Sequence, residues 1–214
     1  MRLVPPEVRS QDSLLAAGHD LAELYGRDPT LPPALLDWTA PLFPCETAQS
    51  ARLREAACWM SDVGSHDHPE FRPEQAFLRI LRQPGIGLDH PSRAFLALTI
   101  ALRYEADSAS PFLTPVRRLL DPAAAKRAEI LGMALRLAYT LSAGTPDLLA
   151  GTRLRADGRR LVLSLVENTG VFAGEAVVRR LTRLAQALEL EAGTETVPQQ
   201  IMDEYERPGR AAVA

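Results

Sequence analysis

Asp62, His66 and His68 are the side chains of this sequence whose types and spacing could do metal chemistry. A carboxylate and two imidazoles within seven residues are a ligand set that zinc or iron accepts, and such a metal could activate a water for hydrolysis. His66 and His68 would face different sides of a helix but could share one side of an extended loop. Asp67 and Pro69 favour a loop that satisfies its own backbone. We therefore expect no metal or catalytic site, and keep these three residues as weak candidates.

Metal-dependent phosphohydrolases of the HD superfamily carry a His-Asp dipeptide at the end of such a helix, where this sequence has Ser61-Asp62. A serine hydroxyl is a poor substitute for an imidazole nitrogen as a metal ligand. His19-Asp20 is a literal His-Asp dipeptide, but it lies mid-helix with no second ligand near it in sequence. An autonomous, degenerate HD-type metal-dependent phosphohydrolase stays open as the alternative reading.

The second chemical signal is arginine, because Lys126 is the one lysine among 24 basic residues. A guanidinium group can donate two parallel hydrogen bonds to a phosphate, which suits it to phosphate binding. Scattered, solvated arginines are the alternative. Six basic residues fall on or beside two central predicted helices and would form a polyphosphate-binding groove if they converged. They are Arg72, Arg79, Arg82, His90, Arg93 and Arg103. Arg179, Arg180 and Arg183 form a second basic strip, which we expect to face solvent or the helices.

Helical periodicity continues through the first two thirds of the chain. It predicts helices over 12–25, 30–38, 47–64, 73–83, 92–105 and 123–141, and the segment 92–105 is apolar on nearly every side. At Gly151 the period changes to alternation, and Asp157-Gly158 predicts a hairpin between two strands. A helix over 172–190 and a strand over 193–197 follow. The predicted fold is mainly α, with an HD-like helical bundle over 1–150, a small α/β module of ββαβ order over 151–198 and a flexible tail over 199–214.

The composition is that of an ordinary globular protein, with 214 residues, 46% hydrophobic, 24% charged and a net charge of -3. No run of eighteen apolar residues occurs, and the N-terminus lacks the apolar core of a signal peptide. A soluble cytoplasmic protein without membrane contacts is the default expectation. Cys45 and Cys58 lie outside any CxxC spacing, so we expect two buried thiols and neither a disulfide nor zinc.

Four segments, taken in order, resemble the C-terminal part of bacterial enzymes of the exopolyphosphatase/guanosine pentaphosphate phosphatase family. They are LLDWTAPLFP, LREAACWMSDVG, HPEFRPEQAF and LDHPSRAFLALTIALRYE. The resemblance is to a subgroup in which Ser-Asp replaces the His-Asp dipeptide. It covers about residues 4–197 and includes the ββαβ ending.

The resemblance implies a full-length hydrolase that releases the terminal phosphate of polyphosphate, or the 5′ phosphate of guanosine pentaphosphate, with Mg²⁺. In that family the catalytic groups lie in two N-terminal domains with the actin-like ATPase fold and glycine-rich phosphate loops. This sequence shows no such loop, and Met1 falls where those domains would end. We therefore expect a chain that is non-catalytic alone and holds no cofactor.

Its expected role is that of a polyphosphate-binding, dimerisation or docking module. The expected partners are polyphosphate or a phosphorylated guanosine nucleotide, together with a catalytic domain or a second copy of the chain, and no specific nucleic acid. A purely structural oligomerisation module without phosphate affinity is a further alternative.

Overall fold

The computed structural model describes residues 12–84, 87–167, 169–171 and 173–206. Four of its helices begin after a residue whose side chain accepts a hydrogen bond from the backbone of the first turn, which satisfies an otherwise unpaired N–H. These caps and helices are Asp12 for α2 (Ser13–Tyr25), Thr47 for α4 (Ala48–Trp59), Asp89 for α6 (His90–Arg103) and Asp121 for α8 (Pro122–Ser142).

Six further helices are described, and several of them carry proline in the first turn, where its missing N–H costs nothing. They are α3 (Leu31–Thr39), α5 (Arg72–Leu81), α7 (Thr114–Arg117), α9 (Pro146–Ala150), α10 (Glu175–Ala187) and α11 (Gln199–Glu206). Three single 3₁₀ turns join them, namely η1 (Ala40–Leu42), η2 (Met60–Asp62) and η3 (Pro111–Leu113). The predicted fold class, mainly α with a small α/β module, is confirmed.

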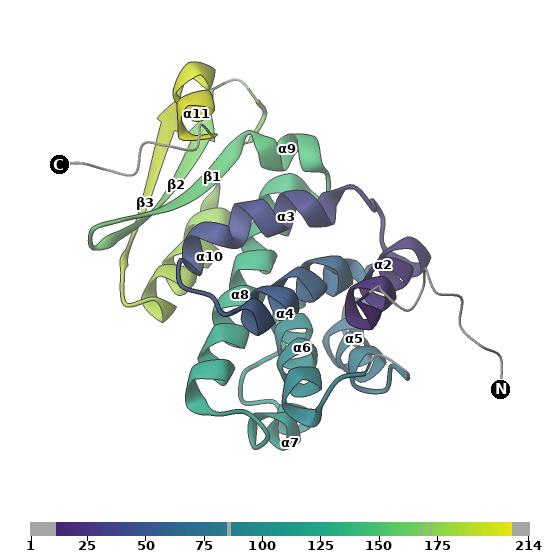
Figure 1. Cartoon of the computed structure of the whole chain (residues 1–214). Helices are drawn as coiled ribbons and strands as arrows, with labels where there is room; N and C mark the ends of the chain where they lie inside the picture. The colour runs from purple at the N-terminus through teal and green to yellow at the C-terminus, as the bar shows by residue number, and fades with distance from the viewer. Residues whose placement is uncertain (1–11, 85–86, 168, 172, 207–214) are drawn as a thin grey trace.

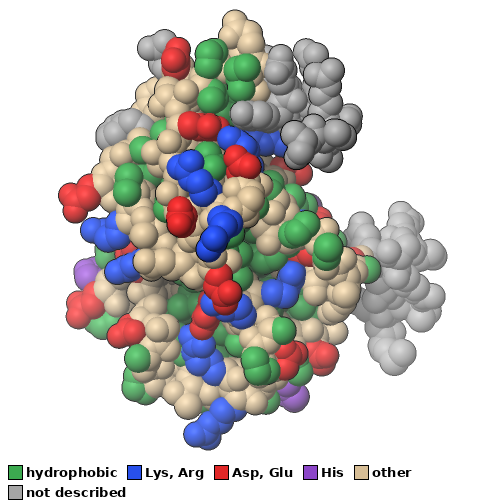
Figure 2. Space-filling view, turned by 90° about the vertical axis from the view of Figure 1, so that its left-hand side faces the viewer, with side chains coloured by type: hydrophobic (Ala, Val, Ile, Leu, Met, Phe, Trp, Pro, Cys, Tyr) green, Lys and Arg blue, Asp and Glu red, His purple; other side chains and the backbone are tan. Residues whose placement is uncertain are grey.

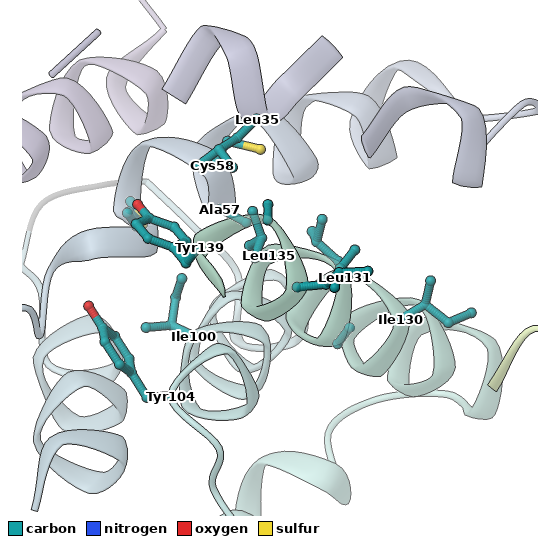
Figure 3. Close-up of a cluster of buried hydrophobic side chains, with 14 of the residues drawn as sticks. Leu35, Ala57, Cys58, Ile100, Tyr104, Ile130, Leu131, Leu135 and Tyr139 are labelled. Carbon is teal, nitrogen blue, oxygen red and sulfur yellow. The ribbon is translucent and has the colours of Figure 1, made fainter. Parts of the chain in front are cut away.

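The centre of the molecule is the crossing of α6 and α8. Every residue from Ala94 to Ala101 is buried, as the apolar run predicted. The two helices approach closely at Gly132, where an added Cβ would lie 2.8 Å from both the Thr99 carbonyl oxygen and the Leu102 Cβ. Figure 3 shows Leu131 and Leu135 along one side of α8, between the helices that pack on either side of it. Glycine at 132 is therefore required by packing rather than by backbone conformation.

The two cysteines are both free, and they differ in exposure. Cys58 lies in the core beside α8, as expected. Cys45 is exposed, so the prediction that it is buried was wrong. It lies in the short connection between η1 and α4, outside the apolar face of either.

The small module has the predicted ββαβ order. β1 (Thr152–Asp157) pairs antiparallel with β2 (Arg160–Val166), and Gly158 supplies the positive φ of 57° that the tight hairpin needs. β2 pairs in parallel with β3 (Glu191–Val197), and α10 makes the crossover between them. In Figure 1 the sheet lies at one end of the helices, with α3 between it and α4.

The module and the helices share one continuous hydrophobic core. Leu154, Leu163 and Leu181 belong to the same cluster of buried side chains as Leu35 and Leu135. The boundary between two domains at residue 150 therefore stays a prediction from the sequence. Among the described residues, no helix is both long and apolar enough to cross a membrane.

The sequence predicted a flexible tail from residue 199, and over 199–206 the structure instead has α11. Met202 is 1% exposed and packs against Val166 and Val197, so one apolar side chain ties this helix to the end of the sheet. The prediction treated the segment as polar and overlooked Ile201 and Met202 as an anchor. Residues 207–214 lie outside the described residues.

Candidate functional site

Asp62 ends the 3₁₀ turn η2 that follows α4, and its carboxylate is held by two arginines. Arg27, in the connection between α2 and α3, donates to it from Nε at 2.9 Å, from Nη2 at 3.1 Å and from its backbone N–H at 3.0 Å. Arg103, at the end of α6, donates from Nη2 at 3.1 Å. We call Arg27, Asp62 and Arg103 the inner triad. Its carboxylate is only 11% exposed.

Two tyrosines fix the inner triad from the side. The Arg103 guanidinium carbon lies 4.0 Å from the Tyr104 ring centroid and 3.8 Å from that of Tyr139, so the group is stacked between two aromatic faces. Figure 3 shows both rings next to Ile100, at the end of the hydrophobic cluster. Burial raises the pKa of both phenols, which keeps them protonated at neutral pH.

The hydroxyls of these tyrosines complete the local hydrogen bonding. Tyr104 accepts from the Gly64 backbone N–H at 2.8 Å, and the Tyr139 hydroxyl lies 2.9 Å from Ser61 Oγ. Ser61 also donates to the Cys58 carbonyl at 2.6 Å, so it is an interior hydrogen-bonding residue. Ser61 therefore serves to fix η2 and Tyr139, and it is not exposed to any ligand.

A second carboxylate joins two further arginines. Glu105 follows α6 in a left-handed conformation with φ of 65°. It pairs with Arg136 of α8 and receives a hydrogen bond of 2.8 Å from Arg180 of α10. We call Arg136, Glu105 and Arg180 the outer triad. It links the helices to the small module.

The arginines of both triads line one cavity of about 420 Å³, together with Asp62, whereas Glu105 pairs with Arg136 and Arg180 from outside its lining. Its walls come from α5, α6, α8 and α10 and from the turns and connections beside them. The lining residues are Arg27, Asp62, Ser65, Arg72, Arg103, Tyr104, Arg136, Tyr139, Thr140 and Arg180. Five arginines line this space, which opens to solvent, and Asp62 is the one carboxylate among the lining residues; with the adjacent Glu105 included, the formal charge is +3. We call it the arginine cavity.

The positive charge of the arginine cavity is incompletely balanced. Arg72 has no carboxylate partner among the described residues, and it donates to the carbonyls of Ser65 and Asp67 at 2.9–3.1 Å. Burial lowers the pKa of Arg136, and repulsion from Arg180 and Arg103 acts in the same direction against the attraction of Glu105. An anion entering the cavity would relieve this repulsion. Phosphate, with several acceptor oxygens, matches guanidinium forks that converge from several sides.

This charge concentration differs from the surface shown in Figure 2. On the face formed by the small module and α10, basic and acidic side chains are interspersed. A neighbouring cavity of about 530 Å³ shares Arg136 and Arg180 with the arginine cavity, but it also contains Glu105, Asp107 and Glu129. Its charges are therefore mixed. Neither surface concentrates positive charge as the arginine cavity does.

The structure separates the three candidate metal ligands, at which no metal site was expected. Asp62 lines the arginine cavity, whereas His66 and His68 are exposed and are not among its lining residues. Within residues 12–84, 87–167, 169–171 and 173–206, no group of three His, Cys, Asp or Glu side chains could hold a metal. The residues around Asp62 also do not fit Mg²⁺, because hard cations need oxygen ligands and both Asp62 oxygens already accept from guanidinium groups.

The predicted six-residue groove is divided between several places. Arg72 and Arg103 reach the arginine cavity. Arg79 pairs with Asp67 at 2.9 Å and borders a separate recess with Arg82. Arg93 donates to carbonyls at the end of α5, and His90 is the first residue of α6. Two of the six residues therefore lie together at one cavity and the other four lie elsewhere, and polyphosphate binding by any of them stays a prediction.

Three cavity arginines were not grouped with this site from the sequence. Arg180 was assigned to the second basic strip, of which Arg179 and Arg183 are exposed while Arg180 turns toward the helices. Arg136 had a usable signal, since it lies three and four residues before Tyr139 and Thr140 and so shares their face of α8. Arg27 lies in a connection between helices, where no periodicity indicates direction.

Comparison with known protein families gives one assignment. The family described as "Exopolyphosphatase, C-terminal" matches residues 14–192, which is most of the chain and includes every residue of the arginine cavity. A search of curated proteins found no significant match.

Proposed function

This chain belongs to the exopolyphosphatase C-terminal family, and from that premise we propose that its arginine cavity binds phosphate groups of inorganic polyphosphate. The observation that carries the proposal is the convergence of five guanidinium groups on one cavity, with Asp62 as the one lining carboxylate and Glu105 paired with two of the arginines from outside the lining. Inorganic polyphosphate is a chain of anions with no apolar part. A cavity with this charge and several forked donors suits such a ligand.

The fixed position of the donors favours affinity. Arg103 is held by Asp62 and by two aromatic rings, and its side chain is 5% exposed. Arg72 is held by two backbone carbonyls. Little side-chain entropy is therefore lost when these groups bind an anion, which reduces the cost of association.

We further propose that the arginine cavity binds without hydrolysing. Cleavage of a phosphoanhydride needs a positioned water, a base and neutralisation of the developing charge. Asp62 is the carboxylate nearest to such a role, but its two oxygens accept four hydrogen bonds from Arg27 and Arg103. A base occupied in this way cannot accept a proton from water unless the inner triad opens.

Two assays on the purified chain test the two parts of the proposal. Long-chain polyphosphate should raise the melting temperature at low salt, because a ligand that binds only the folded state stabilises it, and the rise should fall steeply as salt increases. No shift at low salt would refute binding. With Mg²⁺ and long-chain polyphosphate, we expect no release of phosphate above that of buffer. Release that is lost in Asp62→Asn would instead establish the alternative, an autonomous phosphohydrolase.

A further inference from the structure

The inner and outer triads have the same composition but different surroundings. Each consists of one carboxylate between two arginines that line the arginine cavity. Asp62 is 11% exposed and accepts four hydrogen bonds, whereas the Glu105 side chain is 49% exposed. The Glu105 side chain can therefore turn away from its arginines into solvent, whereas the buried Asp62 side chain cannot.

The backbone also distinguishes Glu105. Its φ of 65° is a left-handed conformation that non-glycine residues adopt at some cost. The chain leaves α6 at this residue, so the side chain is carried on a turn rather than on the helix. Glu105 is consequently attached to the cavity through its two ion pairs and not through packing.

The pairing between Glu105 and its arginines leaves Arg136 incompletely compensated. The Arg136 Nε–H is buried and has no acceptor among the described residues. Burial and the neighbouring Arg180 and Arg103 lower the pKa of Arg136 in spite of Glu105. Burial by itself would raise the pKa of Glu105, but the hydrogen bond and charge of Arg180 together with Arg136 hold that pKa below its usual range, so Glu105 is ionised at neutral pH. The outer triad is a charged group in which an anion of higher charge could replace the carboxylate.

We propose that Glu105 is an exchangeable counter-ion, which a bound phosphate chain displaces from Arg136 and Arg180. Only an anion whose own contacts outweigh the loss of these two ion pairs can then bind. This inference rests on the proposed binding of polyphosphate in the arginine cavity. It assigns to Glu105 a role in ligand selection, while the inner triad stays intact and holds the cavity open.

The exchange favours highly charged anions. Every anion that binds Arg136 and Arg180 must first displace Glu105 from the same two ion pairs. The free energy lost with these ion pairs is therefore the same for every anion. Orthophosphate carries about one to two negative charges near pH 7, so its own contacts with the arginines offset little of that loss. A phosphate chain can contact both triads and Arg72 at once, and it gains several charge-assisted hydrogen bonds for the same loss. The site therefore discriminates by charge and length.

Removal of the Glu105 carboxylate should tighten binding. Once displaced, the Glu105 carboxylate lies in water, where two like charges a few ångströms apart repel with an energy that corresponds to about a five- to tenfold change in affinity. We expect Glu105→Gln to bind tripolyphosphate about tenfold more tightly than the wild type in isothermal titration at low salt. Glu105→Gly serves as the second variant, because glycine adopts a positive φ without strain and the fold should tolerate it.

Glu129→Gln is the matched control. This substitution removes the same charge. Glu129 lies on α8 in the neighbouring cavity, but its partner is Arg117, which does not line the arginine cavity. We expect its affinity for tripolyphosphate to stay within about twofold of the wild type. Equal tightening in Glu129→Gln would show a general charge effect and would overturn the inference.

The outcomes separate the inference from the proposed function. Tightening in both Glu105 variants supports the exchange, including the case in which only the variants bind measurably. Binding by the wild type with unchanged or weaker binding in both Glu105 variants would overturn the exchange and leave polyphosphate binding standing. Absence of binding in all three proteins would overturn both.

Discussion

Replacement of Asp62 by Asn tests whether the inner triad is the structural support of the arginine cavity. The substitution keeps the size of the side chain but removes the charge that faces two guanidinium groups. Arg103 is 5% exposed and would lose its carboxylate partner inside the protein. Breaking a buried ion pair by removing one partner costs about 3–5 kcal/mol. Asn retains one acceptor oxygen and Arg27 is 44% exposed, so we expect the lower value, about 3 kcal/mol.

The assay is urea unfolding followed by far-UV circular dichroism. A chain of this length loses about 2–4 °C in melting temperature per kcal/mol, so a decrease of about 6–12 °C should accompany the loss of unfolding free energy. Asp67→Asn is the matched control, because Asp67 also pairs with an arginine, Arg79, but both side chains are partly exposed. Exposed pairs contribute about 0–1 kcal/mol, and the control should fall in that range.

The comparison of the two variants' losses of unfolding free energy tests the role of the inner triad. If Asp62→Asn costs less than about 1 kcal/mol, or no more than Asp67→Asn, the inner triad does not hold the cavity together. In that case Arg103 would have to be compensated by Tyr104 and Tyr139 alone. The reasoning from buried charge pairing would then be refuted.

Three further predictions address the surroundings of the cavity and the limits of the fold. Arg103→Lys should lower the unfolding free energy by about 2 kcal/mol in urea titrations, since an ammonium group cannot replace a stacked, forked guanidinium; an unchanged value would contradict this. Met202→Ala should cost about 2–4 kcal/mol by the same method if α11 belongs to the fold, and no cost would show that α11 is dispensable. The pairing with Arg52 lowers the pKa of Asp12 from 3.8 to about 2 in the folded state, so its stabilisation is present above pH 4 and is lost as pH falls toward 2. Asp12→Asn should therefore show a smaller loss of stability between pH 4 and pH 2 than the wild type, and parallel curves would contradict the assignment.

The secondary structure was predictable because it is set by local signals. Asp12, Thr47 and Asp121 are helix caps that the sequence displays directly, and the turn at Gly158 requires a positive φ. The buried helix α6 was visible as an apolar run. The end of the fold was not visible, because Ile201 and Met202 are two apolar residues in an otherwise polar segment and the burial of Met202 depends on Val166, 36 positions earlier.

The site was only partly predictable because it depends on long-range convergence. Arg72 and Arg103 were identified by their places beside central helices. Arg27 meets Asp62 across 35 residues and Arg180 meets Glu105 across 75, and no local pattern records those distances. The sequence also does not show which arginine each carboxylate pairs with. Asp62 was therefore considered as a weak candidate metal ligand, whereas in the structure it holds two arginines. Charge pairing in three dimensions separates a cavity residue such as Arg180 from an exposed neighbour such as Arg179.

That pair of neighbours provides the most direct test of polyphosphate binding in the arginine cavity. Arg180→Gln and Arg179→Gln remove the same charge from adjacent positions of α10, and only the first lines the cavity. Isothermal titration of the wild type and both variants with long-chain polyphosphate at low salt compares them directly. A charge-assisted hydrogen bond to phosphate contributes about 1.5–3 kcal/mol, so Arg180→Gln should weaken binding about tenfold or more while Arg179→Gln stays within about threefold. Equal weakening in the two variants would show that polyphosphate binds to general surface charge and would contradict the assignment of the cavity.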